Sequence, residues 1–337
     1  MADWRSYGPR DAGLCIVTPV FNDRACFIRL IQELDQMCSL LACRVSVLAI
    51  DDGSTESPPR NLQAAGPLAT LQKVEIVTLA TNVGHQRAIA VGLAMATQDE
   101  EIDAVVIMDA DGEDRPQDIP RLIEAAQGRD DFVVVAQRHE RTESRAFKIL
   151  YGFYNLLFTT LTGKKLGFGN FSLLSRNYAR RLAMLPDLWN TFPAALMRSR
   201  LPITRLPIDR GHRYAGNSKM SYASLIVHGL SGLSVYSDAI FVRTLIAVGA
   251  LFVTSILVIV GVIIIRLFTD LATPGWATTV VLGTMIIVLQ AIVSTLTGLL
   301  LLLNNRNQRQ VIPALDVHRF VHARTVLALL RPMSAAS

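Results

Sequence analysis

The chain has 337 residues, of which 51% are hydrophobic and 18% charged, so it is long enough for more than one structural unit. Its mean hydropathy of +0.35 is too high for an ordinary soluble enzyme. The excess of apolar residues lies in the C-terminal third of the chain. The net charge of +5 suits nucleic acid, a membrane surface or phosphorylated substrates. Because long apolar segments occur in the same chain, we expect lipid head groups and phosphates as partners, and no nucleic acid.

The cysteines and the N-terminus indicate a cytosolic domain. The chain has four cysteines, Cys15, Cys26, Cys38 and Cys43. They form no Cys-x-x-Cys pair and have no histidine at metal-binding spacing, so we interpret them as reduced thiols. Residues 1–10 contain no apolar signal segment, and we therefore expect residues 1–220 to form a domain that stays in the cytoplasm.

Strands and helices alternate along the first part of the chain. Apolar runs predict strands at residues 14–20, 44–50, 73–79, 104–108 and 132–136. Helical spacing of apolar residues predicts helices at 26–41, 83–96 and 116–126. Near-continuous apolar strands in such an alternation favour a parallel sheet with helices on both faces. Ligands of these sheets bind beyond the carboxyl ends of the strands.

Polar clusters follow three of the predicted strands, at Asn22-Asp23, Asp51-Asp52 and residues 109–113. If the backbone stays extended after Met108, alternate side chains project to one side, and these are Asp109, Asp111 and Glu113. Three carboxylates at this spacing favour Mg²⁺ or Mn²⁺ over zinc. The alternative interpretation of these acidic residues is a solvated loop without a metal. The polar clusters at three strand ends, which are expected to meet at one edge of the sheet, favour the metal site over this alternative.

The pattern loosens after Arg138. We expect an amphipathic helix at residues 147–161, a glycine-rich turn at 167–171 before a short strand, and a strand at 203–208. A basic loop with two glycines follows at residues 209–219.

Two stretches, residues 245–265 and 276–303, contain no charged residue and are long enough to span a bilayer. We expect transmembrane helices at about 245–265 and 278–303, within a membrane segment at 241–303, joined as an antiparallel hairpin. Arginines are concentrated after the second stretch, so both ends of this multi-pass anchor are expected in the cytoplasm.

Two further segments have helical apolar spacing. Residues 221–240 fit an amphipathic helix in the membrane interface, although a core helix of the catalytic domain fits nearly as well. The basic tail, residues 304–337, contains apolar spacing at 317–330 that suggests a second amphipathic helix.

Four motifs occur in order along the chain. They are Val17-Thr18-Pro19-Val20-Phe21-Asn22-Asp23, Ile50-Asp51-Asp52-Gly53-Ser54, Met108-Asp109-Ala110-Asp111 and Arg213-x-x-Gly216-x-Ser218-Lys219. Followed by a membrane hairpin, this series resembles the family 2 GT-A glycosyltransferases, in particular the polyisoprenyl-phosphate branch that includes dolichol-phosphate mannose synthase. The resemblance extends to about Leu303. It implies a Rossmann-like α/β fold with a mostly parallel sheet, an interfacial helix and two C-terminal transmembrane helices.

The resemblance also implies roles for individual residues. The donor nucleotide would be bound by Pro19, Val20, Asn22, Asp23, Asp52, Ala110 and Arg138. Asp109 and Asp111 would hold Mg²⁺ or Mn²⁺ and the diphosphate, and Glu113 stands where the family usually has Gln. Arg213 and Lys219 would hold the phosphates and the sugar. Asp109, Asp111, Arg213 and Lys219 are therefore the expected catalytic residues.

By the same resemblance, the reaction is an inverting transfer of sugar from a UDP- or GDP-linked donor to an undecaprenyl or dolichyl phosphate. The site would face the cytoplasm at the cell membrane, and self-association is compatible with it. A lipid phosphate is already an anion and needs no strong base, whereas its repulsion by the donor diphosphate needs cations. A hydroxyl acceptor such as diacylglycerol, or a scaffold without activity, are the alternatives.

Three motifs depart from the family pattern. Asp23 follows Asn22 where Glu is usual, and Glu113 replaces Gln. Gly169-Asn170-Phe171-Ser172 replaces a Gly-Asp-Phe-Arg pattern and removes a carboxylate near the acceptor. That loss argues against a hydroxyl acceptor, which would need a base. His85 lies in a donor-proximal segment and has either a catalytic role or a local hydrogen-bonding one.

Overall fold

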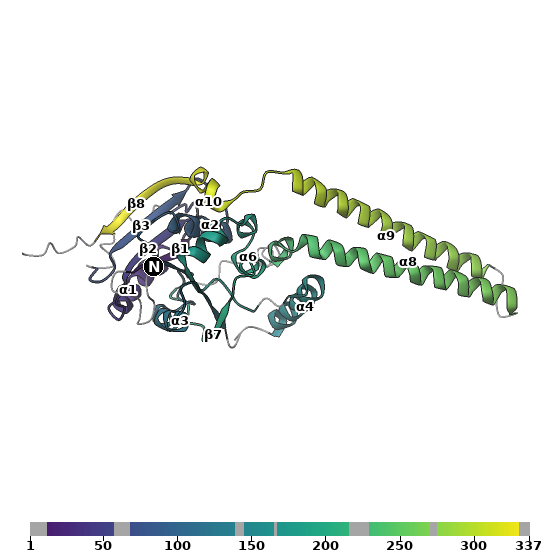
Figure 1. Ribbon diagram of the computed structural model, residues 1–337, viewed down its shortest axis with the longest axis horizontal. Helices are drawn as coiled ribbons and strands as arrows, with labels where there is room; N and C mark the ends of the chain where they lie inside the picture. The colour runs from purple at the N-terminus through teal and green to yellow at the C-terminus, as the bar shows by residue number, and fades with distance from the viewer. Residues whose placement is uncertain are drawn as a thin grey trace, which may run out of the picture. The chain divides into compact units, whose positions relative to one another are not determined.

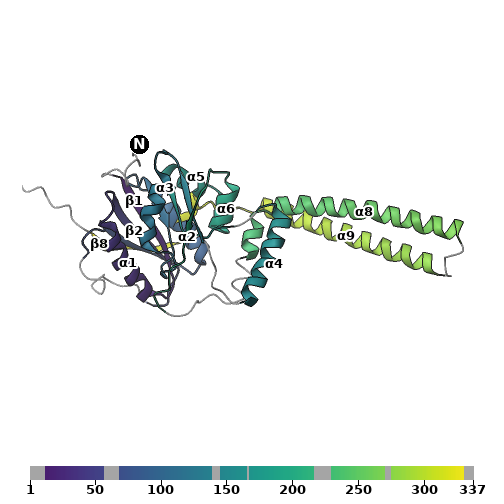
Figure 2. The same ribbon diagram turned by 90° about the horizontal axis from the view of Figure 1, so that it is seen from below.

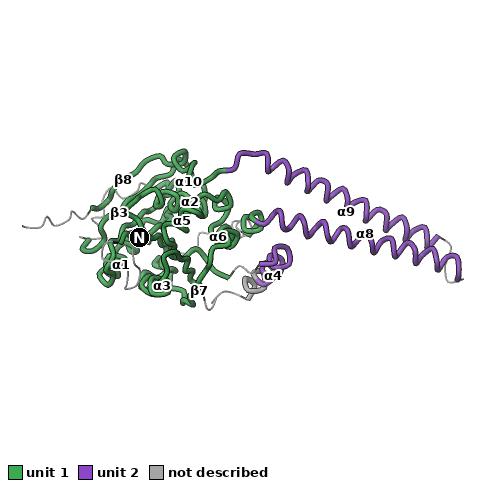
Figure 3. Tube along the Cα trace, viewed as in Figure 1, with its two compact units in different colours: residues 1–151, 166–235, 311–337 green, residues 152–165, 236–310 purple. Residues whose placement is uncertain are grey.

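The computed structural model describes residues 12–56, 68–138, 145–164, 167–215, 229–269 and 275–329. The chain forms two compact units, which Figure 3 shows in different colours. The first unit comprises residues 1–151, 166–235 and 311–337, and the second comprises residues 152–165 and 236–310. The first unit therefore contains chain from both sides of the apolar C-terminal segment.

An eight-stranded sheet in the order β7-β5-β6-β4-β1-β2-β3-β8 forms the centre of the first unit (Figure 1). The strands are β1 (Gly13–Val20), β2 (Arg44–Asp51), β3 (Lys73–Leu79), β4 (Ala104–Ile107), β5 (Val133–Arg138), β6 (Ser172–Ser175), β7 (Thr204–Ile208) and β8 (Val321–Leu329). Strands β4, β1, β2 and β3 run parallel, and β5 is parallel to β7. The predicted mostly parallel sheet is confirmed.

Helices cover both faces of this sheet, as Figure 2 shows in a view turned by 90°. Helices α1 (Arg24–Cys38) and α3 (Ile119–Ala126) contribute to one apolar cluster, and α2 (His85–Ala96), α5 (Arg176–Ala183) and α6 (Phe192–Arg198) contribute to the other. Leu14 and Ile16 of β1 belong to the first cluster, and Cys15 and Val17 belong to the second. This alternation is the expected one for a strand that is buried on both faces.

Short elements complete the unit. They are η2 (Pro116–Asp118), η3 (Pro186–Trp189), α10 (Pro313–Asp316) and η4 (Val317–Arg319). Strand β6 runs antiparallel to both β4 and β5 and lies between them. Its four residues are too few to show a period, so the sequence indicated the strand but not its direction or its place.

The helix expected in the C-terminal tail is wrong for residues 321–329, which form β8 along the edge of β3. Glu75 of β3 is almost fully buried, and its carboxylate pairs with Arg324 and Lys73, each at 2.6 Å. The free backbone groups of the β3 edge supply hydrogen-bond partners that helical periodicity in the tail could not reveal.

Two long apolar helices belong to the second unit, together with residues 152–162 of α4 (Arg145–Thr162). Helices α8 (Ser237–Phe268) and α9 (Trp276–Asn307) have mean hydropathies of 3.0 and 2.5 in their most apolar windows, and those windows are only 11% and 0% buried. At about 1.5 Å per residue each is longer than the roughly 30 Å hydrocarbon core. Both are therefore long and apolar enough to cross a membrane, and the predicted spans lie within them.

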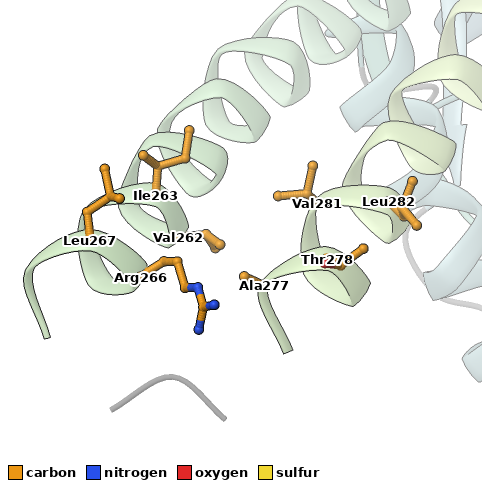
Figure 4. A pocket seen from close by; sticks show the side chains of 8 residues that line it. All are labelled: Val262, Ile263, Arg266, Leu267, Ala277, Thr278, Val281 and Leu282. Carbon is orange, nitrogen blue, oxygen red and sulfur yellow. The ribbon is translucent and has the colours of Figure 1, made fainter. Parts of the chain in front are cut away.

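Near the connection between α8 and α9 lies a pocket, which Figure 4 shows. It is lined by Val262, Ile263, Arg266, Leu267, Ala277, Thr278, Val281 and Leu282. Apart from Arg266 and Thr278 its lining is apolar, so it does not have the composition of the predicted sugar-transfer site.

The first part of the predicted interfacial helix at 221–240, residues 221–228, lies outside the described residues, which resume at residue 229. Residues 229–234 are helical, and α8 begins at Ser237. Leu233 and Tyr236 are buried, whereas Leu230 is exposed.

Candidate active site

The candidate site lies at the carboxyl ends of β1, β2 and β4. Because these neighbouring strands are parallel, their ends adjoin at one edge of the sheet. The loops that follow them are residues 21–23, 52–55 and 108–115. A fourth segment, residues 209–215, follows β7, and we call it the basic strap. The predicted convergence of three strand ends is confirmed by this strand order.

The acidic loop, residues 108–115, is a turn and not an extended segment. Strand β4 ends at Ile107, and Gly112 has a φ of +90°, a left-handed conformation that favours glycine. Asp111 accepts the backbone N–H of Glu113 at 3.0 Å, and Asp114 accepts that of Asp109 at 2.9 Å. Local bonds from aspartate to the backbone compete with an extended chain. The alternation predicted for these carboxylates is therefore wrong.

Asp109 and Asp111 interact closely within this loop. Burial raises the pKa of Asp111 above its usual range, and the neighbouring carboxylate of Asp109 raises it further. Glu113 instead forms an ion pair with Arg210. In the part of the chain that the structure describes, no three His, Cys, Asp or Glu side chains are placed to share a metal ion. The predicted trio is therefore not assembled, and a pair of aspartates remains.

The basic strap is hydrogen-bonded to the acidic loop by its backbone. The N–H of Gly211 donates to the carbonyl of Glu113 at 2.9 Å, and that of Tyr214 donates to the carbonyl of Asp111 at 2.8 Å. The Tyr214 hydroxyl donates to Glu33 of α1 at 2.8 Å. These bonds hold the strap against both the loop and the helix.

Close packing explains a glycine in this arrangement. A Cβ atom on Gly112 would lie 2.8 Å from the ring of Tyr214, which is closer than side chains tolerate. The left-handed backbone and the neighbouring ring therefore both require glycine at position 112.

Arg213 of the strap joins two of the loops. Its Nη1 donates to Asp111 at 3.1 Å, and its Nη2 donates to Asp23 at 3.1 Å. The Arg213 side chain is 20% exposed, so this guanidinium is largely desolvated. Asp23 follows β1 and Asp111 follows β4, so one cation connects the ends of both strands. A planar guanidinium in this position is suited to phosphate oxygens.

Asn22 serves as a clamp between two of the loops. Its Oδ1 accepts the backbone N–H groups of Thr55 at 2.9 Å and Glu56 at 3.2 Å, and its own N–H donates to Ser54 at 2.9 Å. Asn22 has a φ of +48°, a conformation that asparagine tolerates better than most residues. The structure thus gives Asn22 a local structural role, and its predicted role toward the donor stays a prediction.

Adjacent aspartates after β2 differ sharply in their partners. Asp52 is buried and accepts the N–H of Val83 at 2.7 Å and that of Gly84 at 2.9 Å, so it anchors the turn before α2. Asp51 is 3% exposed, and among the described residues its carboxylate accepts only the N–H of Ser54, through Oδ1 at 3.1 Å.

Two buried side-chain polar atoms lack a hydrogen-bond partner among the described residues, and they are Oδ2 of Asp51 and Oγ1 of Thr18. Buried polar groups in proteins are nearly always paired, so an unpaired one calls for an explanation. Thr18 lies two residues before Val20, which is opposite Asp51 in the ladder of β1 and β2. Both atoms therefore belong to the same pair of strand ends.

His85 and Asn170 lie beside Asp109. The Nε2 of His85 is 3.2 Å from Oδ1 of Asp109, and the amide of Asn170 donates to the same oxygen at 3.4 Å. Burial lowers the pKa of His85, but the carboxylates around it, Asp109 first and then Asp111 and Asp114, together outweigh this effect, so the net shift of the pKa is upward. The position that lacks the family's carboxylate thus contributes a neutral amide to the site.

The remaining predicted residues are placed as follows. Pro19 and Val20 are buried at the end of β1, and Ala110 is buried in the acidic loop. Arg138 ends β5, which β6 separates from β4 in the sheet. Lys219 lies outside the described residues.

The aspartate pair could hold a divalent cation. Two carboxylates that disfavour each other's ionisation gain from a positive charge between them, and Mg²⁺ and Mn²⁺ prefer oxygen ligands. Phosphate oxygens and water commonly complete such sites, so two protein carboxylates are sufficient. The residues present therefore fit a cation that binds together with a diphosphate.

Sequence reasoning missed several contributors. Arg210 and Tyr214 stood within the predicted basic loop, but their acidic partners, Glu113 and Glu33, lie far away in sequence. Asp51 differs from Asp52 only in its hydrogen bonds, which no sequence pattern reports.

Comparisons with known proteins agree with the motifs. Residues 15–187 match the family model described as Glycosyl transferase family 2. The chain is 32% identical over 222 residues to an undecaprenyl-phosphate 4-deoxy-4-formamido-L-arabinose transferase of Erwinia tasmaniensis, and 31% identical over 223 residues to one of Klebsiella pneumoniae. The alignments cover 63% of this chain and 64% and 63% of the relatives, so the chain spans less than two thirds of their length.

A solved structure of glucosyl-3-phosphoglycerate synthase from Mycobacterium tuberculosis, in complex with Mn²⁺ and UDP-glucose, aligns with a TM-score of 0.46 at 15% identity. That alignment covers 68% of this chain and 79% of the other. The family model, by contrast, spans more than half of the 337 residues and includes the strand ends that form the site. This chain therefore belongs to glycosyl transferase family 2.

Proposed function

We propose that this protein is an inverting glycosyltransferase that moves a sugar from a nucleotide diphosphate sugar to a polyprenyl phosphate at a membrane. The contact of Arg213 with both Asp111 and Asp23 is the observation that carries the proposal. It fixes a cation at the strand ends, where a donor diphosphate and an acceptor phosphate would otherwise repel each other. The two membrane-length helices support a lipid acceptor, as do the names of the curated relatives.

The acceptor chemistry follows from the charges of the site. An oxygen of the lipid phosphate forms a bond to the anomeric carbon, and the bond from that carbon to the β-phosphate oxygen breaks on the opposite face. The electron pair leaves with the nucleoside diphosphate, and no proton has to be removed. The neutral amide of Asn170 is compatible with this reaction, whereas a hydroxyl acceptor would need a base.

Arg213 would stabilise the charge that develops on the leaving diphosphate. Its guanidinium presents several N–H donors in a fixed plane, which matches phosphate oxygens. Removal of a donor of this kind typically costs a factor of about 10² to 10³ in kcat. Lys219 and Arg138 are proposed as further cations for the phosphates and the sugar.

Asp109 and Asp111 would hold Mg²⁺ or Mn²⁺. A bound cation supplies charge neutralisation at the diphosphate, as it does in other transfers from nucleotide diphosphates. Glu113 stays with Arg210 in this arrangement, so we propose that it fixes the strap and does not bind the metal.

Asp51 would recognise the nucleotide base. Its Oδ2 is a buried acceptor to which no described residue donates, so an N–H or O–H of a ligand would satisfy it. Uracil and guanine both carry a ring N–H group, so either UDP or GDP fits this acceptor. Pro19, Val20, Asn22, Asp23, Asp52 and Ala110 would shape the surrounding donor site.

The membrane topology is part of the proposal. The first unit contains residues on both sides of α8 and α9, so a membrane-spanning hairpin must have both ends on one side. Arginines that follow α9, such as Arg309 and Arg319, favour the cytoplasmic side, although Arg266 lies at the opposite end. A reporter fused within the connection near Gly275 should be active only outside the cytoplasm. Cytoplasmic activity of that reporter would overturn the orientation.

Transfer assays with the full chain in detergent or vesicles test the proposal. Labelled UDP- and GDP-sugars, Mn²⁺ and undecaprenyl phosphate should give a labelled lipid that is sensitive to mild acid, and diacylglycerol should give none. Arg213→Ala should abolish the product, whereas Arg181→Ala, at an exposed position of α5, should leave it unchanged. A product with diacylglycerol alone would favour the hydroxyl-acceptor alternative, and no product with any pair would favour the scaffold.

A further inference from the structure

Gln86, in the first turn of α2, is 8% exposed, and both ends of its side-chain amide are hydrogen-bonded. Its Oε1 accepts the backbone N–H of Phe192 at 2.8 Å and the hydroxyl of Thr191 at 3.2 Å. Its Nε2 donates to Oδ1 of Asn170 at 3.0 Å. A backbone N–H can only donate, so Phe192 fixes which end of Gln86 carries the oxygen.

The fixed orientation of the Gln86 amide also determines the orientation of the Asn170 amide. Because Nε2 of Gln86 is a donor, the atom of Asn170 that faces it must be the oxygen. The amide nitrogen of Asn170 is thereby directed to the other side, where Oδ1 of Asp109 lies at 3.4 Å and Nε2 of His85 lies at 3.1 Å. The orientation of the Asn170 amide is thus set by a backbone group of α6, two hydrogen bonds away.

We propose that Gln86 is a positioning residue that fixes the carboxylate of Asp109 for cation binding, through Asn170. The inference rests on the proposed function, since it assigns Asp109 to a divalent cation. Asn170 donates to one oxygen of Asp109 and so selects the rotation of its carboxylate next to Asp111. Groups that orient a metal ligand in this way typically change metal affinity or activity by about 10- to 100-fold when mutated.

The proposal explains why an amide is suitable at position 170. A carboxylate there could still accept from Gln86, but its second oxygen would face the acceptor oxygen of Asp109 and repel it. The turn before α2 supports the same geometry, because Asp52 holds the N–H groups of Val83 and Gly84 and so fixes the start of the helix. Gln86 therefore sits on a firmly anchored turn.

Gln86→Glu is the sharpest test, because it keeps the size of the side chain and replaces the donor with an acceptor. Oε1 can still accept from Phe192, but the second oxygen would repel Oδ1 of Asn170 and favour the flipped amide. Thr191→Val is the matched control, since it removes one bond to Gln86 and leaves the bond from Phe192. Asn170→Ala is a second variant that leaves Gln86 and its bonds to α6 in place.

The readout is Mn²⁺ binding to the full-length protein, measured by calorimetry with UDP and GDP present, alongside thermal unfolding and sugar transfer. We expect Gln86→Glu and Asn170→Ala each to weaken Mn²⁺ binding about tenfold or more, and Thr191→Val to change it less than twofold. In the Asn170→Ala background, Gln86→Glu should have no further effect, because Gln86 acts through Asn170.

Two outcomes would overturn the inference. Folded Gln86→Glu and Asn170→Ala proteins that bind Mn²⁺ as the wild type does would show that the relay does not position Asp109. Additive losses in the double variant would show that Gln86 acts by another route. Wild-type protein that binds Mn²⁺ but transfers no sugar would refute the proposed function alone.

Discussion

Asp51→Asn should separate ligand binding from stability at the end of β2. The Oδ2 atom of Asp51 is buried and has no hydrogen-bond partner in the part of the chain that the structure describes, whereas Oδ1 accepts the N–H of Ser54. The substitution keeps an oxygen for Ser54 and removes a buried charge. A buried polar group without a partner costs about 1–3 kcal/mol, so the unliganded protein should not lose stability.

The affinity for nucleotide, unlike the stability of the unliganded protein, should fall in this variant. A hydrogen bond to a charged acceptor contributes about 1.5–3 kcal/mol, and about 1.4 kcal/mol corresponds to a factor of ten. If Asp51 accepts an N–H from the base, Asp51→Asn should weaken the binding of UDP or GDP by about 10- to 150-fold. Calorimetric titration of the full-length protein with each nucleotide measures this change and identifies the base.

Asp52→Asn is the natural control. Both oxygens of Asp52 accept backbone N–H groups, so one of them would face an amide donor after substitution. We expect a loss of about 1–2 kcal/mol in the free energy of unfolding, measured by thermal or denaturant unfolding. The reasoning is refuted if Asp51→Asn binds both nucleotides within twofold of the wild type, or destabilises the protein more than Asp52→Asn does.

Three further predictions concern other parts of the first unit. Arg213→Lys should lower kcat about 10- to 100-fold, because a single ammonium group cannot contact Asp111 and Asp23 at once as the planar guanidinium does. A wild-type kcat in steady-state kinetics would contradict this prediction. Gly112→Ala should impair Mn²⁺ binding, because its Cβ would clash with Tyr214. Gly152→Ala, where the space around the added Cβ is open, should not impair it. Equal Mn²⁺ binding by both variants would count against the packing argument. Burial opposes the charged form of Glu75, but hydrogen bonds from Arg324 and Lys73 hold its pKa below 4.5, so this stabilisation is present above pH 4.5 and is lost as the pH falls further. Melting temperatures between pH 3 and 6 should therefore fall less steeply for Glu75→Gln, and parallel curves would exclude the contribution.

The parallel part of the fold could be predicted because it is local. Strands β1 to β4 are predominantly apolar runs, and α1 and α2 have clear apolar spacing, so each of these elements was visible within one window of sequence. Strands β6 and β8 were not predictable in place or direction, since β6 has four residues and β8 pairs with β3 across some 240 residues of chain.

Part of the candidate site could likewise be predicted from the sequence, and part could not. The acidic motif at Asp109 and Asp111 and the arginine at position 213 were identifiable from their order along the chain. The fold of the acidic loop was not, because the left-handed Gly112 and the bond from Asp111 to Glu113 replace the extended backbone that the spacing suggested. The partnership of Glu113 with Arg210 depends on tertiary packing that follows from that turn.

The position of β8 imposes an order on biosynthesis. The strand that covers the edge of β3 is synthesised only after α8 and α9. Until then, the growing chain carries β3 with one bare edge and Glu75 without Arg324. The sheet is therefore completed last, once the apolar hairpin has been synthesised, and a chain that stops within the hairpin would expose an edge open to pairing with other molecules.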